Sequence, residues 1–95
     1  MIPNLSEAMI RRHTTGRSFE RGQHYCRAGA VSSLIQRGNV LWAQVEGTEA
    51  APYRIRIWVD SGGIKSASCS CLYDYEGWCK HIVATLIDCL YQPIN

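Results

Sequence analysis

The stretch that decides the fold runs from Cys69 to Tyr91 and reads CSCLYDYEGWCKHIVATLIDCLY. It opens with Cys69-Ser-Cys71, continues through a loop rich in aromatic residues, and returns to Cys79-Lys-His81. Three thiols and one imidazole match the closed tetrahedral shell that Zn²⁺ takes in structural sites. A set of buried or redox-reactive thiols is the alternative. The prediction is one structural zinc ion per chain, held by Cys69, Cys71, Cys79 and His81.

The spacing within each ligand pair sets the secondary structure around it. Side chains at i and i+2 of a strand point to the same side, so the end of a strand presents Cys69 and Cys71 together. On a helix, residues i and i+2 lie about 200° apart, so Cys79 and His81 cannot both bind the metal from regular helical turns. We therefore expect Cys79 just before a helix and His81 in its first turn.

Hydrophobic periodicity predicts the remaining elements. After Cys79 the apolar side chains follow a helical stripe wide enough to pack on a sheet. Upstream the period is 2, and it predicts strands over residues 31–36, 40–46, 53–60 and 64–70. The short turns between them favour an antiparallel meander.

Two helices are predicted before the first strand. One covers residues 5–14, and the second runs from Ser18, a good N-cap, to Gly29, which suits a left-handed C-terminal position. Gly22 inside the second helix costs about 1 kcal/mol relative to alanine, so we expect a close neighbour there. The predicted fold class is α+β: a small zinc-binding domain with N-terminal helices, a four-stranded antiparallel β-meander, a zinc knuckle and a C-terminal helix packed on the sheet.

The motif C-x-C-x7-C-x-H resembles the SWIM-type zinc finger, and SCSCLYDYEGWCKHIVAT is similar to the bacterial members of that family. The upstream residues Phe19, Gly22, Tyr25, Gly29 and Val31 resemble the pattern F-x-x-G-x-x-Y-x-x-x-G-x-V that precedes the finger there. We place the finger domain at residues 17–95 and a helical extension at residues 1–16. The resemblance implies a zinc-binding module, found among others in helicase-like ATPases and transposases, that binds DNA or other proteins. It implies no reaction.

Length and composition limit the classes of protein to which this chain can belong. A chain of 95 residues with 46% apolar and 19% charged residues suits one small globular domain and excludes collagen-like, fibrous and disordered classes. No apolar run of about eighteen residues and no secretory signal is present, so we expect a soluble, cytoplasmic protein without a membrane partner. Five cysteines is an odd number. We therefore expect the cysteines to bind a metal or to remain free thiols in preference to forming disulfides.

The charge pattern bears on the partner. The net charge is +2, and residues 1–37 hold six arginines against two glutamates, whereas the remainder holds four basic and six acidic residues. We expect DNA or RNA to bind through phosphate contacts. The alternative is a zinc-stabilised protein-interaction module that docks a partner such as a helicase-like ATPase. The candidate nucleic-acid-binding residues are Arg54, Arg56, Lys80 and Tyr75. The aromatic residues of the loop could equally cover the metal.

No catalytic constellation stands out. A catalytic zinc needs an open coordination position, and a Cys3His set leaves none. No Ser-His-Asp set, P-loop or paired-carboxylate motif is visible. We therefore expect no enzyme and no small-molecule substrate. Of the remaining thiols, Cys26 is interpreted as a core cysteine and Cys89 as a partly buried small hydrophobic residue.

Overall fold

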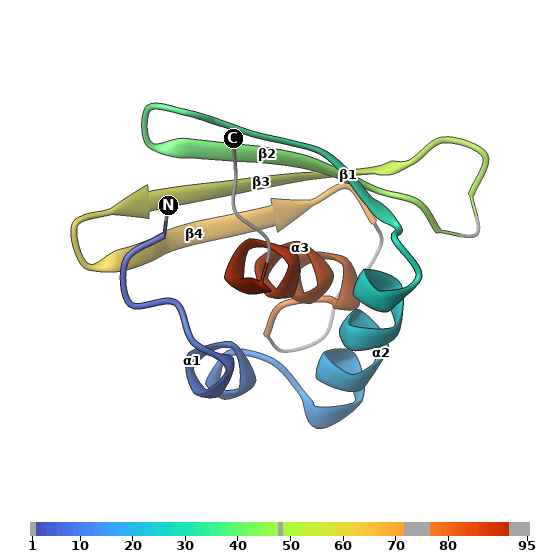
Figure 1. Cartoon of the computed structure of the whole chain (residues 1–95), viewed down its shortest axis with the longest axis horizontal. Coiled ribbons are helices and arrows are strands. Elements are labelled where there is room, and N and C mark those ends of the chain that lie inside the picture. The colour runs from blue at the N-terminus through green and yellow to red at the C-terminus, as the bar shows by residue number, and fades with distance from the viewer. Residues whose placement is uncertain (1, 48, 72–76, 92–95) are drawn as a thin grey trace.

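Three helices lie on one side of a four-stranded antiparallel sheet (Figure 1). The computed structural model describes residues 2–47, 49–71 and 77–91. The predicted α+β class is confirmed. In chain order the elements are α1 (Glu7–Arg12), α2 (Gly16–Arg27), β1 (Val31–Arg37), β2 (Val40–Val45), β3 (Tyr53–Asp60), β4 (Gly63–Cys69) and α3 (Lys80–Tyr91).

The second helix begins earlier than predicted. Its N-cap is Thr15, whose Oγ1 accepts a hydrogen bond from the backbone N–H of Ser18, with an N···O distance of 3.1 Å. Ser18 itself is buried inside the helix, so the prediction that Ser18 is the N-cap is wrong. Threonine and serine cap helices by the same hydrogen bond, and the sequence offers both three residues apart. Tertiary packing decides between them, because it draws Ser18 into the interior.

The predicted stop of this helix is confirmed. Gly29 has a φ of +73°, in the left-handed region. Its N–H donates to the carbonyl of Cys26 at 3.1 Å, and the N–H of Ala30 donates to the carbonyl of Tyr25 at 3.0 Å. These two bonds form a Schellman motif, which satisfies the last carbonyls of the helix.

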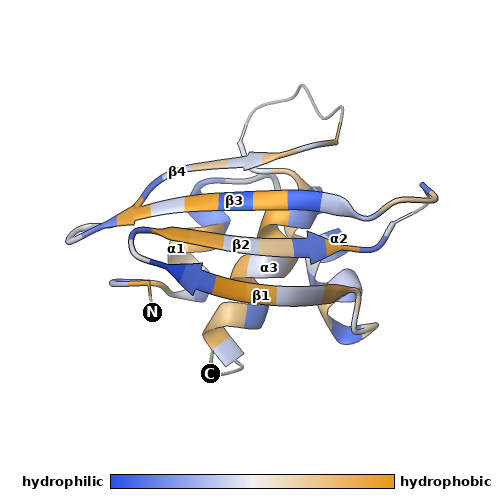
Figure 2. Ribbon diagram, turned by 90° about the horizontal axis from the view of Figure 1, so that it is seen from above, coloured by the Kyte–Doolittle hydropathy of each residue, from blue (hydrophilic) through white to orange (hydrophobic). Residues whose placement is uncertain are grey.

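The sheet is a meander in the order β1-β2-β3-β4. Along β3 the apolar side chains of Ile55 and Ile57 are buried, whereas Arg54 and Arg56 are exposed on the opposite face. A bulge interrupts the pairing of β1 with β2, and Ser33 within it has a φ of +54°. Figure 2 views the sheet from its open face, with the helices behind it.

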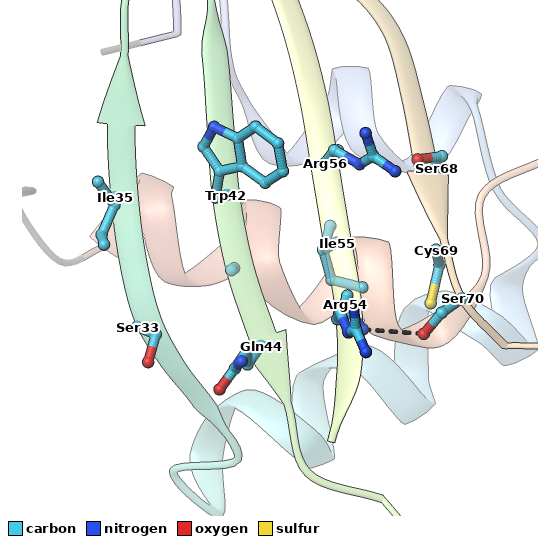
Figure 3. A pocket seen from close by; sticks show the side chains of 11 residues that line it. Ser33, Ile35, Trp42, Gln44, Arg54, Ile55, Arg56, Ser68, Cys69 and Ser70 are labelled. Carbon is cyan, nitrogen blue, oxygen red and sulfur yellow. Dashed lines mark hydrogen bonds between the residues drawn. The ribbon is translucent and has the colours of Figure 1, made fainter. Parts of the chain in front are cut away.

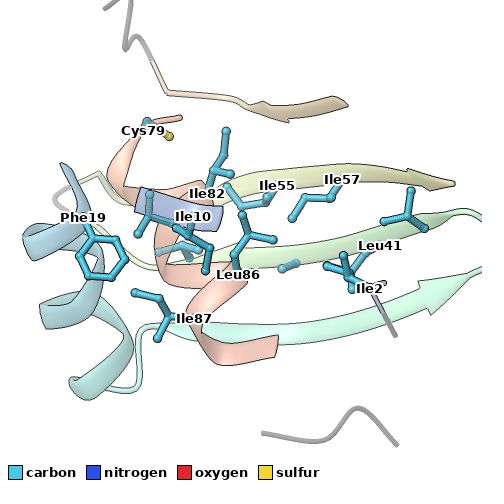
Figure 4. Close-up of a cluster of buried hydrophobic side chains, with 14 residues drawn as sticks. Ile2, Ile10, Phe19, Leu41, Ile55, Ile57, Cys79, Ile82, Leu86 and Ile87 are labelled. Atoms are coloured by element: carbon cyan, nitrogen blue, oxygen red, sulfur yellow. The ribbon is translucent and has the colours of Figure 1, made fainter. Parts of the chain in front are cut away.

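Helix α3 lies at the centre of the core, between the sheet and the other helices (Figures 1 and 4). Residues 81–87 are all buried. Gly22 of α2 is the point of closest approach, because a Cβ built there would lie 2.5 Å from Cγ1 of Val83. The expected close neighbour of Gly22 is therefore a side chain of α3.

The N-terminal segment contributes to the same core. Ile10 is fully buried and Ile2 nearly so, and both belong to the cluster that contains Phe19 and Leu86. The division of the chain at residue 16 stays a prediction. No helix in the described ranges is long and apolar enough to cross a membrane.

Candidate metal centre

The four predicted ligands converge where β4 ends and α3 begins. Cys69 is the last residue of β4, Cys71 follows two residues later, Cys79 directly precedes α3, and His81 is the second residue of that helix. Their ligand atoms all lie within 4.8 Å of one another. The expected placement of Cys79 before the helix and of His81 in its first turn is confirmed.

The interatomic distances fit a tetrahedral zinc shell. Zn–S bonds of about 2.3 Å and Zn–N bonds of about 2.0–2.1 Å give S···N edges of about 3.6 Å. Nδ1 of His81 lies 3.7 Å from Sγ of Cys69 and 3.9 Å from Sγ of Cys79. The site therefore fits one structural zinc ion, with Nδ1 of His81 as the nitrogen ligand and no coordination position left over.

Hydrogen bonds between the thiols shift the pKa values of Cys69 and Cys79 in opposite directions. A hydrogen bond from Cys69, with further bonds from His81 and from the backbone N–H of Ile82, lowers the pKa of Cys79 well below its ordinary value. The pKa of Cys69 is raised in turn, because its thiol proton is held by Cys79. A thiolate at Cys79 also lies at the positive end of α3. Zinc binding must displace the protons that the other thiols retain.

Two tyrosine rings hold the imidazole in place. The ring of Tyr53 stacks on His81, with centroids 4.1 Å apart and planes 28° apart, and the Tyr25 ring lies at 5.3 Å. His81 is 3% exposed, and its Nε2 has no hydrogen-bond partner among the described residues. Ring stacking therefore fixes the plane of the imidazole, whose Nδ1 faces the sulfurs of Cys69 and Cys79. Sequence reasoning did not assign these tyrosines to the site, although Tyr25 belongs to the upstream family pattern.

Residues 13–14, after α1, anchor the chain just before Cys79. The hydroxyl of Thr14 donates to the carbonyl of Trp78 at 2.6 Å, and the N–H of Trp78 donates to the carbonyl of His13 at 2.9 Å. The rings of His13 and Trp78 lie 4.9 Å apart. Gly77 has a φ of +81°, and a Cβ there would lie 2.6 Å from the carbonyl oxygen of His13. No sequence signal links segments 64 residues apart, so sequence reasoning missed this anchor.

The candidate nucleic-acid-binding residues do not form one group. Arg54 and Arg56 lie on the open face of the sheet (Figure 3). Lys80 extends over the ring of Tyr25 in α2, with Nζ 5.5 Å from the ring centroid, and so faces the helical side of the molecule. Tyr75 lies outside the described residues, as does most of the aromatic loop that was considered as a cover for the metal.

Purified protein is expected to contain one zinc ion per chain, and a Cys71→Ser variant is expected to lose most of it, because three ligands do not close the shell. Elemental analysis of freshly purified, reduced protein measures both. Cys89→Ser is the matched control: Cys89 is half-buried, lies outside the cluster, and has its pKa raised to about 12 by burial. Equal zinc content in the two variants would contradict the ligand assignment.

Comparisons with known proteins agree with this site. Residues 53–90 match the SWIM family, described as the SWIM zinc finger, and the resemblance found in the sequence is confirmed over these residues. The chain is also 42% identical over 48 residues to the uncharacterized protein Rv2102 of Mycobacterium tuberculosis. That alignment covers 50% of this chain and 17% of Rv2102, so the chain spans a small part of this relative's length. No solved structure matches the chain significantly.

Proposed function

We propose that this chain, with a SWIM zinc finger at residues 53–90, binds nucleic acid through the open face of its sheet. The observation that carries the proposal is the arrangement of β3. Arg54 and Arg56 are two residues apart on one strand and project from the same exposed face. The planar, positively charged guanidinium group suits bidentate recognition of phosphate.

The surroundings of these arginines favour an anionic partner. A shallow hollow of about 610 Å³ extends across the open face from β1 to the end of β4, with Arg54 and Arg56 in its lining (Figure 3). None of the eleven residues that line it is acidic, and several carry hydroxyl or amide groups that hydrogen-bond to phosphate. The lining residues are Ser33, Ile35, Trp42, Ala43, Gln44, Arg54, Ile55, Arg56, Ser68, Cys69 and Ser70.

The arginines of α1 and α2 lie on the other side of the molecule. Both helices pack beneath the sheet together with α3 (Figures 1 and 2). The positive charge of these two helices therefore does not extend the surface of Arg54 and Arg56. Binding rests on the open face, and few phosphates are contacted, so we expect weak binding with little sequence preference.

Replacing Arg54 and Arg56 by glutamate is expected to weaken binding to every DNA sequence. Each phosphate contact contributes about 0.7–0.9 to the slope of log affinity against log salt, so the slope should flatten by about 1.5. Fluorescence anisotropy over a salt series measures both quantities. The matched control is Arg12→Glu with Arg17→Glu, which makes the same charge change at exposed residues of α1 and α2.

Two results would count against this surface. The control pair could weaken binding as much as the strand pair, which would show that net charge alone matters. Alternatively, the strand pair could bind like the unmodified protein. Zinc content should be equal in all variants, so that loss of the metal site is not mistaken for loss of contacts.

A second candidate function is docking of a protein on the same face. Ile35 is 47% exposed and Trp42 is 43% exposed, and the two residues are paired across β1 and β2. Adjacent exposed apolar side chains are common in protein interfaces. Affinity for such a partner would change little with salt, whereas affinity for nucleic acid falls steeply.

We propose no reaction at the metal. Four protein ligands fill the tetrahedral shell, so the ion has no open position for water or substrate. The role of the metal is to hold the end of the edge strand β4 against α3, and thereby to support β3, the neighbouring strand that carries Arg54.

A further inference from the structure

We propose that the open face of the sheet binds single-stranded nucleic acid by stacking an unpaired base on Trp42. This inference rests on the proposed function and specifies the form of nucleic acid that is bound. Trp42 projects from the middle of β2 into the hollow described above, and 43% of its surface is exposed (Figure 3). Ile35, its partner on β1, is 47% exposed, so the ring belongs to an exposed apolar patch and is not an isolated surface residue.

Arg56 links the exposed ring to the charge of the face. It pairs with Trp42 across β2 and β3, and its guanidinium carbon lies 5.2 Å from the centroid of Trp42 and 5.8 Å from that of Trp58. One cation thus lies between two indole rings. In single-strand binding proteins, aromatic rings stack with bases while neighbouring arginines contact the backbone and add cation–π attraction. The open face combines both groups within one hollow.

The shape of the face prevents it from contacting the bases of duplex DNA. Four strands spaced about 4.8 Å apart make a surface about 14 Å across between the outer strands, before side chains are added. The major groove is about 12 Å wide and admits a helix or a two-stranded ribbon, so this sheet cannot enter it. Bases within a duplex are stacked on one another and offer no ring face to Trp42. Unpaired bases do, so stacking requires a single strand.

The polar rim of the hollow suits a flexible strand. Hydroxyl groups of Ser33, Ser68 and Ser70 line the hollow, and Ser33 lies at the bulge in β1. Hydroxyls donate and accept hydrogen bonds, so they can contact a base edge or a phosphate without demanding one sequence. We therefore expect weak sequence preference.

The test measures binding of two fluorescein-labelled ligands at low salt: a single-stranded oligothymidine of about twelve nucleotides and a duplex of equal length. This length lies within the site sizes of single-strand binding proteins. Trp42→Leu keeps apolar bulk but removes the aromatic ring. It should weaken single-strand binding about 5- to 150-fold, the range found for loss of one stacked base, and leave duplex binding unchanged. Trp42→Phe should recover most of the lost affinity. Tyr91→Leu is the control, because Tyr91 is 66% exposed on α3, away from this face.

The outcomes separate this inference from the function on which it rests. If the Arg54 and Arg56 reversal weakens both forms while Trp42→Leu changes neither, stacking is overturned and phosphate binding stands. A phenylalanine variant as weak as the leucine variant also overturns stacking. If the unmodified protein binds neither oligonucleotide at low salt, the proposed function fails and this inference fails with it. A purified protein partner lost in Trp42→Leu, without oligonucleotide binding, would assign the face to protein docking.

Discussion

Chelation of the zinc is expected to abolish the amide-exchange protection of α3. Structural zinc contributes apparent binding free energies of about 10–16 kcal/mol in finger peptides at neutral pH, whereas whole domains have unfolding free energies of about 5–15 kcal/mol. The metal therefore supplies stabilisation of the same order as the entire domain. Helix α3 begins directly at two ligands, Cys79 and His81, so its first turn loses its anchor when the ion is removed.

The consequence should extend beyond the helix. Residues 81–87 are buried between the sheet and α2, so disordering of α3 uncovers the inner face of the sheet. Hydrogen exchange followed by mass spectrometry, before and after full chelation, measures the effect along the chain. Adding zinc back should restore protection, which distinguishes loss of the metal from irreversible damage. Unchanged protection of residues 80–91 in metal-free protein would show that the zinc is not structural.

Replacing Gly22 by alanine is expected to destabilise the domain by up to about 2 kcal/mol net, because overpacking a core costs about 1–3 kcal/mol. The added carbon would lie 2.5 Å from Cγ1 and 2.8 Å from Cβ of Val83, and 3.1 Å from the backbone nitrogen of Ala84. Neither the Val83 Cβ nor the Ala84 backbone can rotate away, so α2 and α3 must move apart. The gain in helix propensity of about 1 kcal/mol offsets only part of this cost. Thermal and denaturant unfolding of the zinc-bound protein measure it.

Gly16→Ala in the same helix is the matched control. A Cβ at Gly16 meets no atom within 4 Å, so this substitution changes backbone entropy without changing packing. It should leave stability equal or raise it by up to about 1 kcal/mol. If Gly22→Ala behaves like Gly16→Ala, the close approach of the two helices is not what requires glycine at residue 22.

The ligand set and most of the elements were predictable because they depend on local spacing. Cys69 and Cys71 are two residues apart at the end of a strand, and Cys79 and His81 straddle the start of a helix, so each pair follows from backbone geometry alone. The third strand was predicted at residues 53–60, as observed, because apolar side chains at every second position alternate with mostly charged ones. Hydrophobic periodicity likewise located α3.

Local signals failed where several residues could serve equally well. Thr15 and Ser18 are both good caps, and the helix uses Thr15 because Ser18 is needed inside. The sequence also shows which residues of a strand share a face, but not where the arginines of α1 and α2 lie relative to that face. Their separation from Arg54 and Arg56 depends on which side of the sheet the helices cover, and that is a property of the whole packing.

The sequence by itself determined the metal, its four ligands and the order of helices and strands around them, because these depend on residue type and on spacings of a few residues. Only the tertiary structure decided what surrounds the metal and what faces outward. Three contacts illustrate this: Tyr53 stacks on His81, Thr14 anchors Trp78, and Arg56 lies beside the exposed ring of Trp42. Each contact joins segments that are distant in sequence or lie on neighbouring strands. Such contacts form only when the core closes, since the burial of α3 against the sheet brings those segments together.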